Sequence, residues 1–316
     1  MKAASSMTKE RNMKYRRLGN TGFEVSAVVY GGIVSMAHGD GRVYQSDGQA
    51  ASEGHVAWAI DHGINYFDVA PTYGDAQQMM GNSLRPYRKG VYLACKTEAR
   101  DRAQAEALML ESLKLLHKDY FDVYQMHALS TMKDLEVAFG PGGVMELMRE
   151  MKQKGIARKL GITAHSEAVA LKALELYDFD TVLFPFNWHM HMAHGMGSTL
   201  NTATKEKGAG LLCMKSMIER AWTEEERYAS KYPKSWCKPI DVDDEPEWLL
   251  AAVKYALSLG VDAIVPPGNF DHFRFAVEHI DEAVSAPLSE RDRALLAERM
   301  ESVKSRPFFG SDCYTL

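Results

Sequence analysis

The sequence predicts a (β/α)₈ barrel, with an N-terminal β-hairpin and an extra C-terminal helix. Along the 316 residues, short apolar runs alternate with longer amphipathic stretches, and this alternation occurs eight times. The apolar runs do not alternate strictly between apolar and polar residues, as expected for strands of a parallel sheet that is buried on both faces. Eight strand–helix repeats in order favour a closed barrel over an open sheet.

The elements follow in order along the chain. The hairpin is expected at residues 13–18 and 23–26, around a Gly-Asn-Thr-Gly turn, where it would close the bottom of the barrel. The predicted strands are residues 27–30, 64–69, 91–96, 121–126, 157–162, 181–186, 210–214 and 262–265. The predicted helices are residues 48–62, 76–84, 103–116, 144–154, 166–177, 198–207, 247–259 and 270–280, followed by a final helix at 289–302.

Domain organisation is expected to be simple. Residues 1–12 are expected to form a flexible N-terminal arm and residues 13–316 a single domain, because no linker or low-complexity tract interrupts the pattern. Least readable are the segments 31–47, 128–142, 188–197 and 216–246, which we expect to be loops. The last of these is a long insertion after the seventh strand, and a loop of that length is usually functional or mobile.

Composition excludes several classes of protein. The net charge of −5 argues against a nucleic-acid binder, which needs a surplus of Lys and Arg. The four cysteines (Cys95, Cys213, Cys237 and Cys313) lie far apart, which argues against a zinc site, an iron–sulfur site or a disulfide framework. The first residues lack the apolar segment of a secretory signal, and no apolar run is long enough to span a membrane. We therefore expect a cytoplasmic protein without a membrane anchor.

Four polar residues fall where three consecutive predicted strands end. Asp68 and Tyr73 follow the second strand, Lys96 ends the third and His127 follows the fourth. The carboxyl ends of barrel strands share one rim, so these side chains are expected to meet there. Alone, each is more often structural, but four at successive strand ends favour a shared site.

Reduction of a carbonyl suits these residue types, because it adds a hydride to carbon and a proton to oxygen. A free tyrosine has a pKa of about 10, and a nearby lysine ammonium lowers it by favouring the phenolate. We predict Tyr73 as the proton donor and Lys96 as the group that lowers its pKa. Asp68 would then pair with Lys96, and His127 would hold the substrate oxygen by a hydrogen bond.

These residues stand in segments that resemble the aldo-keto reductase superfamily. The segments are GINYFDVAPTYG, ACKTEA and DVYQMHAL around the four residues, with MKYRRLGNTGFEVSAVVYGG, GIARKLGIT and IVPPGNFDHFRFAVEHI elsewhere. They extend from about residue 13 to residue 280. The resemblance implies a (β/α)₈ barrel that binds NADP(H), with NAD(H) as the alternative, and reversibly reduces small aldehydes or ketones to alcohols.

The resemblance also implies contacts to the cofactor. The positions that match are Gly32, Asp68, Thr163, Met214, Lys215, Gly268, Asn269, Phe270, Arg274 and Glu278. Among them, Asn269 and Phe270 open the last barrel helix, where backbone amides suit a phosphate. Arg274 falls where the family often places an arginine for the 2′-phosphate of NADP, and Glu278 where it contacts the adenine, usually through asparagine.

The chain departs from the family pattern around the nicotinamide. Thr163-Ala164-His165 replaces the usual Ser-Asn after strand five, and Leu183 replaces a glutamine in strand six. Met214 replaces the stacking tyrosine in strand seven, where a polarizable thioether can still pack against a ring. Lys215, which follows it, is placed to approach the pyrophosphate.

Aromatic and histidine residues follow the later strands. His189, His191 and His194 form a cluster of a kind that can bind zinc or iron, but no carboxylate or cysteine lies nearby in sequence, so we expect no metal. Trp188, His189 and Trp236 are candidates for a substrate pocket. Equally, the two tryptophans could pack the long loop onto the barrel.

Two alternatives to a reductase remain open from the sequence. The chain could be a non-catalytic, cofactor-binding regulatory subunit, like the aldo-keto reductase-like beta subunits of potassium channels. It could also be a Schiff-base lyase that uses Lys96, since a strand-end lysine in a barrel can form imines. The neighbouring Asp68 and Tyr73 argue against the lyase, because they favour a charged lysine, which is a poor nucleophile.

Overall fold

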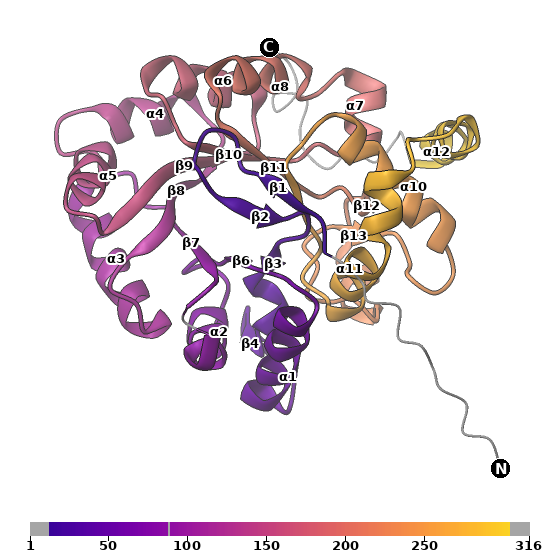
Figure 1. The fold of residues 1–316 in the computed structure, drawn as a ribbon, viewed down its shortest axis with the longest axis horizontal. Helices are drawn as coiled ribbons and strands as arrows, with labels where there is room; N and C mark the ends of the chain where they lie inside the picture. The colour runs from indigo at the N-terminus through magenta and orange to yellow at the C-terminus, as the bar shows by residue number, and fades with distance from the viewer. Residues whose placement is uncertain (1–12, 88, 304–316) are drawn as a thin grey trace.

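Eight parallel strands form a barrel at the centre of the computed structural model, which describes residues 13–87 and 89–303 (Figure 1). The expected N-terminal arm at residues 1–12 and Cys313 lie outside the described residues. Neighbours in the sheet follow chain order, β3-β6-β7-β8-β9-β10-β11-β14. The strands are β3 (Tyr30–Gly31), β6 (Tyr66–Asp68), β7 (Tyr92–Thr97), β8 (Phe121–Leu129), β9 (Ala157–Ala164), β10 (Thr181–Phe184), β11 (Gly210–Met214) and β14 (Ala263–Val265).

The barrel closes between its first and last strands. The Val29 amide donates to the Ile264 carbonyl at 2.9 Å, and the Ile264 amide donates to the Ala27 carbonyl at 3.0 Å. The first strand was expected at residues 27–30, but β3 itself is only Tyr30–Gly31, and the residues before it make this closing bridge. The predicted (β/α)₈ fold is confirmed.

Helices surround the barrel and follow its strands. They are α1 (Gly48–Asp61), α2 (Ala76–Ser83), α3 (Arg102–Leu116), α5 (Val144–Gln153), α6 (Glu167–Leu176), α8 (Ser198–Lys207), α10 (Pro246–Ser258) and α11 (Phe270–Ser285). The expected C-terminal helix is α12 (Glu290–Val303), which packs on α10. None of the described helices is long and apolar enough to cross a lipid bilayer.

The segments expected to be loops contain further short elements. They are η1 (Gly32–Ser35), β4 (His38–Gly39), β5 (Arg42–Val43), α4 (Met132–Phe139), α7 (Trp188–His194), β12 (Ile218–Arg220), α9 (Glu224–Ala229) and β13 (Lys238–Pro239). A further 3₁₀ turn, η2, spans Arg85–Tyr87. The expectation of loops was therefore wrong for parts of all four segments. For α4, a capping box of Thr131 and Asp134 is the sequence signal that marks the start.

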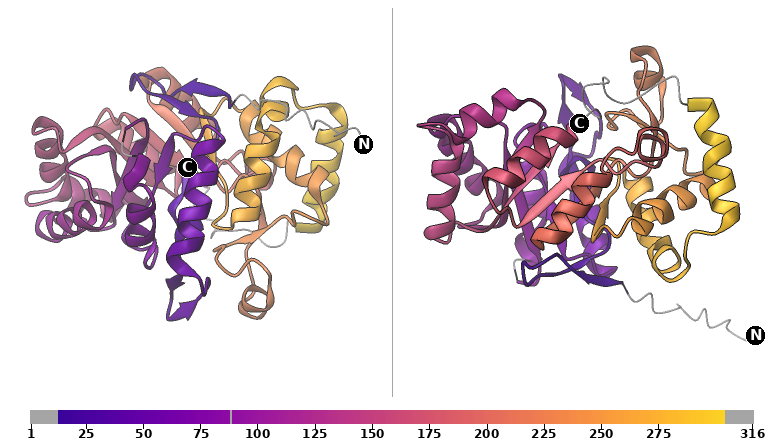
Figure 2. Two further views of the ribbon diagram at one scale, coloured as in Figure 1. Left: turned by 60° about the horizontal axis from the view of Figure 1, so that its bottom comes forward. Right: turned by 90° about the horizontal axis from the view of Figure 1, so that it is seen from above.

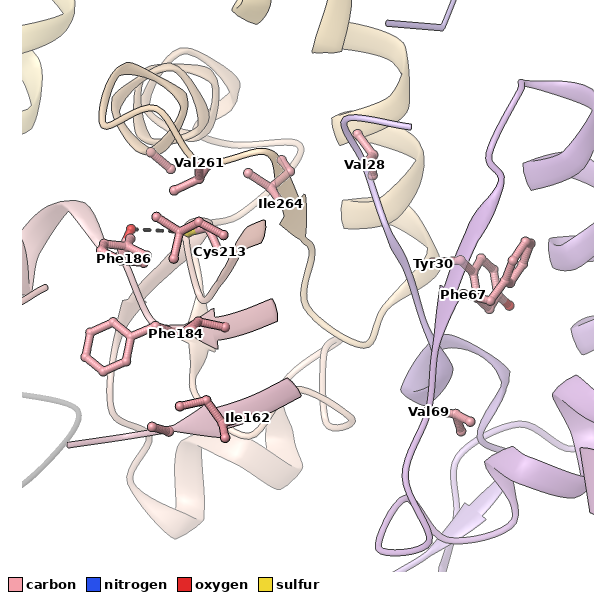
Figure 3. Close-up of a cluster of buried hydrophobic side chains, with 14 of the residues drawn as sticks. Val28, Tyr30, Phe67, Val69, Ile162, Phe184, Phe186, Cys213, Val261 and Ile264 are labelled. Carbon is pink, nitrogen blue, oxygen red and sulfur yellow. Dashed lines mark hydrogen bonds between the residues drawn. The ribbon is translucent and has the colours of Figure 1, made fainter. Parts of the chain in front are cut away.

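Side chains of the strands alternate between two apolar layers, because successive residues of a strand point to opposite faces. The inner layer fills the barrel and includes Val29, Tyr66, Ala94, Val123, Leu183, Leu212 and Ala263. In each case the next residue along the chain belongs to the outer layer, between strands and helices. Figure 3 shows part of this outer layer, in which Tyr30 of β3 and Phe67 of β6 pack with ring centroids 5.1 Å apart.

The two ends of the barrel are different. At the bottom, the hairpin of β1 (Tyr15–Arg17) and β2 (Glu24–Ser26) lies across the opening and contributes Leu18, Phe23 and Val25 to the inner layer. At the opposite end, the β4–β5 hairpin and α9 project beyond the barrel (Figure 2, left). That end carries the carboxyl termini of the strands, where a barrel of this kind places its site.

Candidate active site

The side chains at the top of the barrel continue the inward-facing rows of the inner layer. Asp68 lies two residues after the inward-facing Tyr66, and Lys96 two residues after Ala94. The period of two along a strand therefore turns both polar side chains into the mouth of the barrel. Here the apolar filling ends and a cluster of polar groups begins.

A buried ion pair forms the floor of this cluster. The Lys96 ammonium, in a side chain with no exposed surface, donates to the Asp68 carboxylate and, at 3.5 Å, to the Val69 carbonyl. The other Asp68 oxygen accepts from the Gln125 amide at 2.9 Å. Burial is the largest single influence and works against the charged ammonium, but the charges of Asp68 and Tyr73 and the hydrogen bond to Asp68 together outweigh it and raise the pKa of Lys96 to about 12. Lys96 is therefore held as a fixed cation.

Tyr73 lies above this pair, in the loop that follows β6. Its hydroxyl oxygen is 3.4 Å from the Lys96 ammonium nitrogen. Burial raises the pKa of Tyr73, and the positive charge of Lys96 lowers it by a smaller amount. Lys96 thus lowers this pKa, as expected, but the pKa is raised overall because loss of hydration penalises the phenolate more strongly. Tyr73 is thus a protonated donor beside a fixed positive charge.

His127 stands beside Tyr73 in β8, with ring centroids 5.8 Å apart in an edge-to-face arrangement. A bulge interrupts the pairing of β8 with β9 between Met126 and Leu129, and Ala128 adopts a left-handed conformation with φ of 53°. Bulges of this kind redirect side chains next to active sites. Burial and then the charge of Lys96 lower the pKa of His127 well below its usual range, so the ring is neutral near pH 7.

These four residues line one pocket with a volume of about 250 Å³. The pocket therefore brings together Asp68, Tyr73, Lys96 and His127 from three neighbouring strands, as predicted. Its wall also includes Ile33, Glu98, Thr163, His165, Leu183, Met214, Lys215, Lys234, Trp236, Cys237 and the segment Val265–Gly268. Most of the exposed wall is apolar, so the few polar groups are well placed to fix the orientation of a ligand.

The predicted cofactor contacts divide into two sets. Asp68, Thr163, Met214, Lys215 and Gly268 line the pocket, whereas Gly32, Asn269, Phe270, Arg274 and Glu278 do not. Gly32 lies against Val69, where a Cβ atom would come within 2.6 Å of the valine side chain, so its absence of a side chain serves packing.

The contacts outside the pocket lie at the start of α11. Asn269 precedes the helix and has a buried side-chain nitrogen without a hydrogen-bond partner among the described residues. Phe270 stacks on His55 with centroids 3.9 Å apart. Arg274 is half-exposed and lies 3.5 Å from Asp271, and Glu278 is exposed one turn further on. Residues 270, 274 and 278 are spaced by four and therefore share one face of α11.

The three substrate-pocket candidates take different positions. Trp236 lines the pocket, is 46% exposed and lies edge-to-face to Tyr73 at 5.6 Å. Trp188 is fully buried and donates to the Ile218 carbonyl at 3.1 Å, so it packs the insertion onto the barrel. His189 is also fully buried and does not line the pocket. For Trp188 the structure therefore agrees with the packing alternative, and for His189 it contradicts the expected place in the pocket, because α7 turns both side chains into the core.

The histidine cluster does not converge on one point. His191 lies 2.8 Å from the Tyr255 hydroxyl and 3.1 Å from the Ser198 hydroxyl through its two ring nitrogens. Within residues 13–87 and 89–303, no three His, Cys, Asp or Glu side chains are placed to hold a metal ion.

Sequence reasoning missed three polar residues of the site. Gln125 could have been found, because it lies two residues before His127 on the same face of β8. His165, of which only the departure from the family pattern was noted, lines the pocket 3.4 Å from Lys215, and burial together with this lysine lowers its pKa to about 3. Nothing in the sequence around Lys234 indicates its place in the site, since its hydrogen-bond partners lie some two hundred residues earlier in the chain.

Lys234 ties the insertion to the loop after β3 across the edge of the pocket. Its ammonium donates to the Val34 carbonyl at 2.9 Å and to the Gln45 side chain. Nearby, the Arg42 guanidinium lies 3.6 Å from the ring centroid of Tyr228, which belongs to α9. We call these contacts of Lys234 and Arg42 the clasp. Burial lowers the pKa of Lys234 to about 7.

Comparison with known proteins gives one consistent family. The model of the aldo/keto reductase family matches residues 31–264. Aldo-keto reductase YhdN of Bacillus subtilis is 29% identical over 168 residues, which make up 49% of this chain and 48% of that protein. The "probable voltage-gated potassium channel subunit beta" of Arabidopsis thaliana is 30% identical over 129 residues, or 36% of this chain and 37% of that protein. The matched segments thus span about half the length of these curated relatives, or less.

Solved structures share the fold over nearly the whole chain. The holo form of aldo-keto reductase AKR11C1 from Bacillus halodurans superposes with a TM-score of 0.67 at 19% identity, and covers 95% of this chain and 99% of that chain. At this identity the likeness concerns the fold alone. The family match covers most of the chain, and this chain belongs to the aldo/keto reductase family.

Proposed function

We propose that the protein is an NADP(H)-dependent oxidoreductase that reduces an aldehyde or ketone to an alcohol, with Tyr73 as the proton donor. One observation carries the proposal. The Tyr73 hydroxyl lies at the pocket wall, 3.4 Å from an ammonium that is itself bound to a buried carboxylate. A proton donor in this position is ready to protonate an oxygen that develops negative charge.

Each of the four residues has a distinct task. Tyr73 gives its proton to the carbonyl oxygen, and the charge of Lys96 stabilises the phenolate that remains. Asp68 keeps Lys96 charged and in place. His127, neutral because its pKa lies well below the usual range, donates a hydrogen bond to the same oxygen without competing for the proton.

The residues around the pocket fit a nicotinamide dinucleotide. Thr163, Met214 and Lys215 would hold the nicotinamide end, and Gly268 and Asn269 the phosphates. The side-chain nitrogen of Asn269, which has no partner among residues 13–87 and 89–303, would be a donor. Arg274 and Glu278, on the face of α11 that also carries Phe270, would contact the 2′-phosphate and the adenine. When bound, the reduced cofactor supplies the hydride that reduces the carbonyl carbon.

Turnover distinguishes this function from a regulatory role. Oxidation of NADPH should be measured with sugars, steroids, quinones and small aldehydes, with NADH as the parallel cofactor. We expect turnover with at least one carbonyl class and a preference for NADPH. Tight NADPH binding without turnover of any carbonyl would instead support a regulatory subunit. We further expect the enzyme to work in the cytoplasm, where Cys95, Cys213 and Cys237 would stay free thiols.

The lyase alternative is disfavoured by the state of Lys96. A pKa raised to about 12 leaves the amine protonated and unable to attack a carbonyl. Borohydride treatment in the presence of a carbonyl substrate should therefore leave Lys96 unlabelled. A reduced adduct on Lys96 would support the lyase.

A further inference from the structure

Each of the three guanidinium nitrogens of Arg100 donates a hydrogen bond, either to the backbone at or near His127 or to the helix α4. Its Nη2 donates to the His127 carbonyl at 2.7 Å and its Nη1 to the Glu98 carbonyl at 3.0 Å. Its Nε donates to the Asp134 carboxylate at 3.2 Å. Asp134 is itself fixed, because it forms the capping box of α4 with Thr131. The side chain of Arg100 is only 14% exposed, so this fork is a rigid part of the barrel rim.

The backbone that Arg100 holds is strained. Ala128 follows His127 directly and has φ of 53°, which side chains other than glycine rarely adopt. On its other side the Ala128 amide donates to the Thr163 hydroxyl at 2.7 Å. A left-handed alanine persists only where its surroundings over-determine it. Arg100 and Thr163 supply this restraint from the two sides of the turn.

We propose that Arg100 is a positioning residue for His127, because it clamps the His127–Ala128 turn so that the imidazole faces Tyr73. The catalytic consequence rests on the proposed carbonyl reduction, whereas the placement of the ring does not. The fork provides two separate effects. The geometry of the guanidinium fixes the orientation of the His127 ring, and its positive charge disfavours protonation of that ring.

Charged and titratable groups face His127 from every neighbouring element. They are Lys96 of β7, Tyr73 of the loop after β6, Arg100 after β7, His165 after β9 and Lys215 after β11. Three of them, Lys96, Arg100 and Lys215, are permanent or near-permanent cations, and each of these charges lowers the pKa of His127. Removal of the Arg100 charge should therefore raise this pKa toward the ordinary value of about 6.5.

Two substitutions separate geometry from charge. Arg100→Lys keeps the charge but lacks the planar fork, and Arg100→Met lacks both. Arg158→Met is the matched control, since Arg158 pairs with Asp122 at 2.7 Å near the bottom of the barrel. Two quantities are measured by NMR with labelled rings. They are the cross-relaxation between the His127 and Tyr73 rings and the pH titration of the His127 ring. The variant His127→Gln serves to assign the His127 signal.

We expect the ring-to-ring cross-relaxation to weaken in both Arg100 variants, and the pKa of His127 to rise in Arg100→Met alone. Both quantities should be unchanged in Arg158→Met. In turnover assays, both Arg100 variants should lose about 10- to 100-fold in kcat, with little change in the affinity for NADPH. Unchanged cross-relaxation in both Arg100 variants would overturn the proposal. If the wild-type protein has no turnover, the proposed reaction fails, and the two NMR readouts still decide the role of Arg100.

Discussion

The Lys96 ammonium nitrogen lies 3.4 Å from the Tyr73 hydroxyl oxygen, and on its other side it binds the Asp68 carboxylate. Lys96 thus connects a buried carboxylate to a hydroxyl at the pocket wall. The buried pair is neutral as a whole, so it is tolerated in the core, yet its positive end faces Tyr73. The stability of the fold and the proposed proton transfer would therefore depend on the same contact.

Asp68→Asn should destabilise the protein strongly. Asparagine still accepts from Gln125, but it leaves Lys96 as a buried charge without a partner, which costs about 3–5 kcal/mol in such pairs. Urea unfolding at pH 7 measures the loss. The double variant Asp68→Asn with Lys96→Met should recover most of it, because the uncompensated charge is gone. An equal loss in the single and double variants would contradict this interpretation.

An exposed ion pair provides the control for that experiment. Lys207 pairs with Asp178, whose side chain is 88% exposed, at 2.6 Å. Asp178→Asn should change the free energy of unfolding by less than about 1 kcal/mol, because water screens this pair.

Arg274→Ala should weaken the binding of NADPH more than the binding of NADH. The half-exposed guanidinium is free to reorient from Asp271 toward a 2′-phosphate, and charge-assisted hydrogen bonds of this kind contribute about 1.5–3 kcal/mol. We expect the Kd for NADPH to rise by about 10-fold or more, while that for NADH stays nearly constant, as measured by quenching of tryptophan fluorescence. Arg291→Ala, on the exposed face of α12, is the control. Equal weakening of both cofactors would remove the argument for NADP.

The clasp should make release of the cofactor depend on pH. Burial lowers the pKa of Lys234 to about 7 in the closed clasp, and hydration would return it toward its ordinary value of 10.5 once the clasp opens. Between these values the open state binds one more proton, so a rise in pH favours the closed state. We expect the NADPH dissociation rate, measured by stopped flow, to fall from pH 7 to pH 9.

Lys234→Met tests the origin of that dependence. The variant should release NADPH at a rate nearly independent of pH over this range, because the titrating group is absent. Lys231→Met removes an exposed lysine of the same insertion, which pairs with Asp241 and Asp243, and should keep the wild-type dependence. A release rate that rises with pH in the wild type would contradict the assigned direction.

Local periodicity was enough to predict the barrel and the cluster of polar residues at its rim. Asp68 and Lys96 follow inward-facing residues by two positions, and this regularity is readable without a structure. The direction in which the pKa of Tyr73 shifts was not predictable, because it depends on how much water the pocket excludes. The place of Trp188 could not be decided from the sequence, since a residue just after a strand can face either the pocket or the core when a helix such as α7 begins there.

Contacts between residues far apart in the chain could not be predicted from the sequence. Lys234 meets Val34 and Gln45 only because the insertion folds back over the loop after β3, and nothing near residue 234 records this. The role proposed for Arg100 likewise depends on its contact with Asp134 and on the bulge after His127, and neither could be predicted from the residues next to it. The capping box that starts α4 was present in the sequence and was overlooked.

Replacement of Tyr73 by phenylalanine is the most direct test of proton donation. NADPH-dependent reduction of the best carbonyl substrate should be compared in the wild type, in Tyr73→Phe and in Tyr15→Phe, which removes a hydroxyl bound to Gly63 at the other end of the barrel. We predict that Tyr73→Phe loses at least about 100-fold in kcat with an unchanged Kd for NADPH, and that Tyr15→Phe keeps full activity. Full activity in Tyr73→Phe would contradict the role of Tyr73.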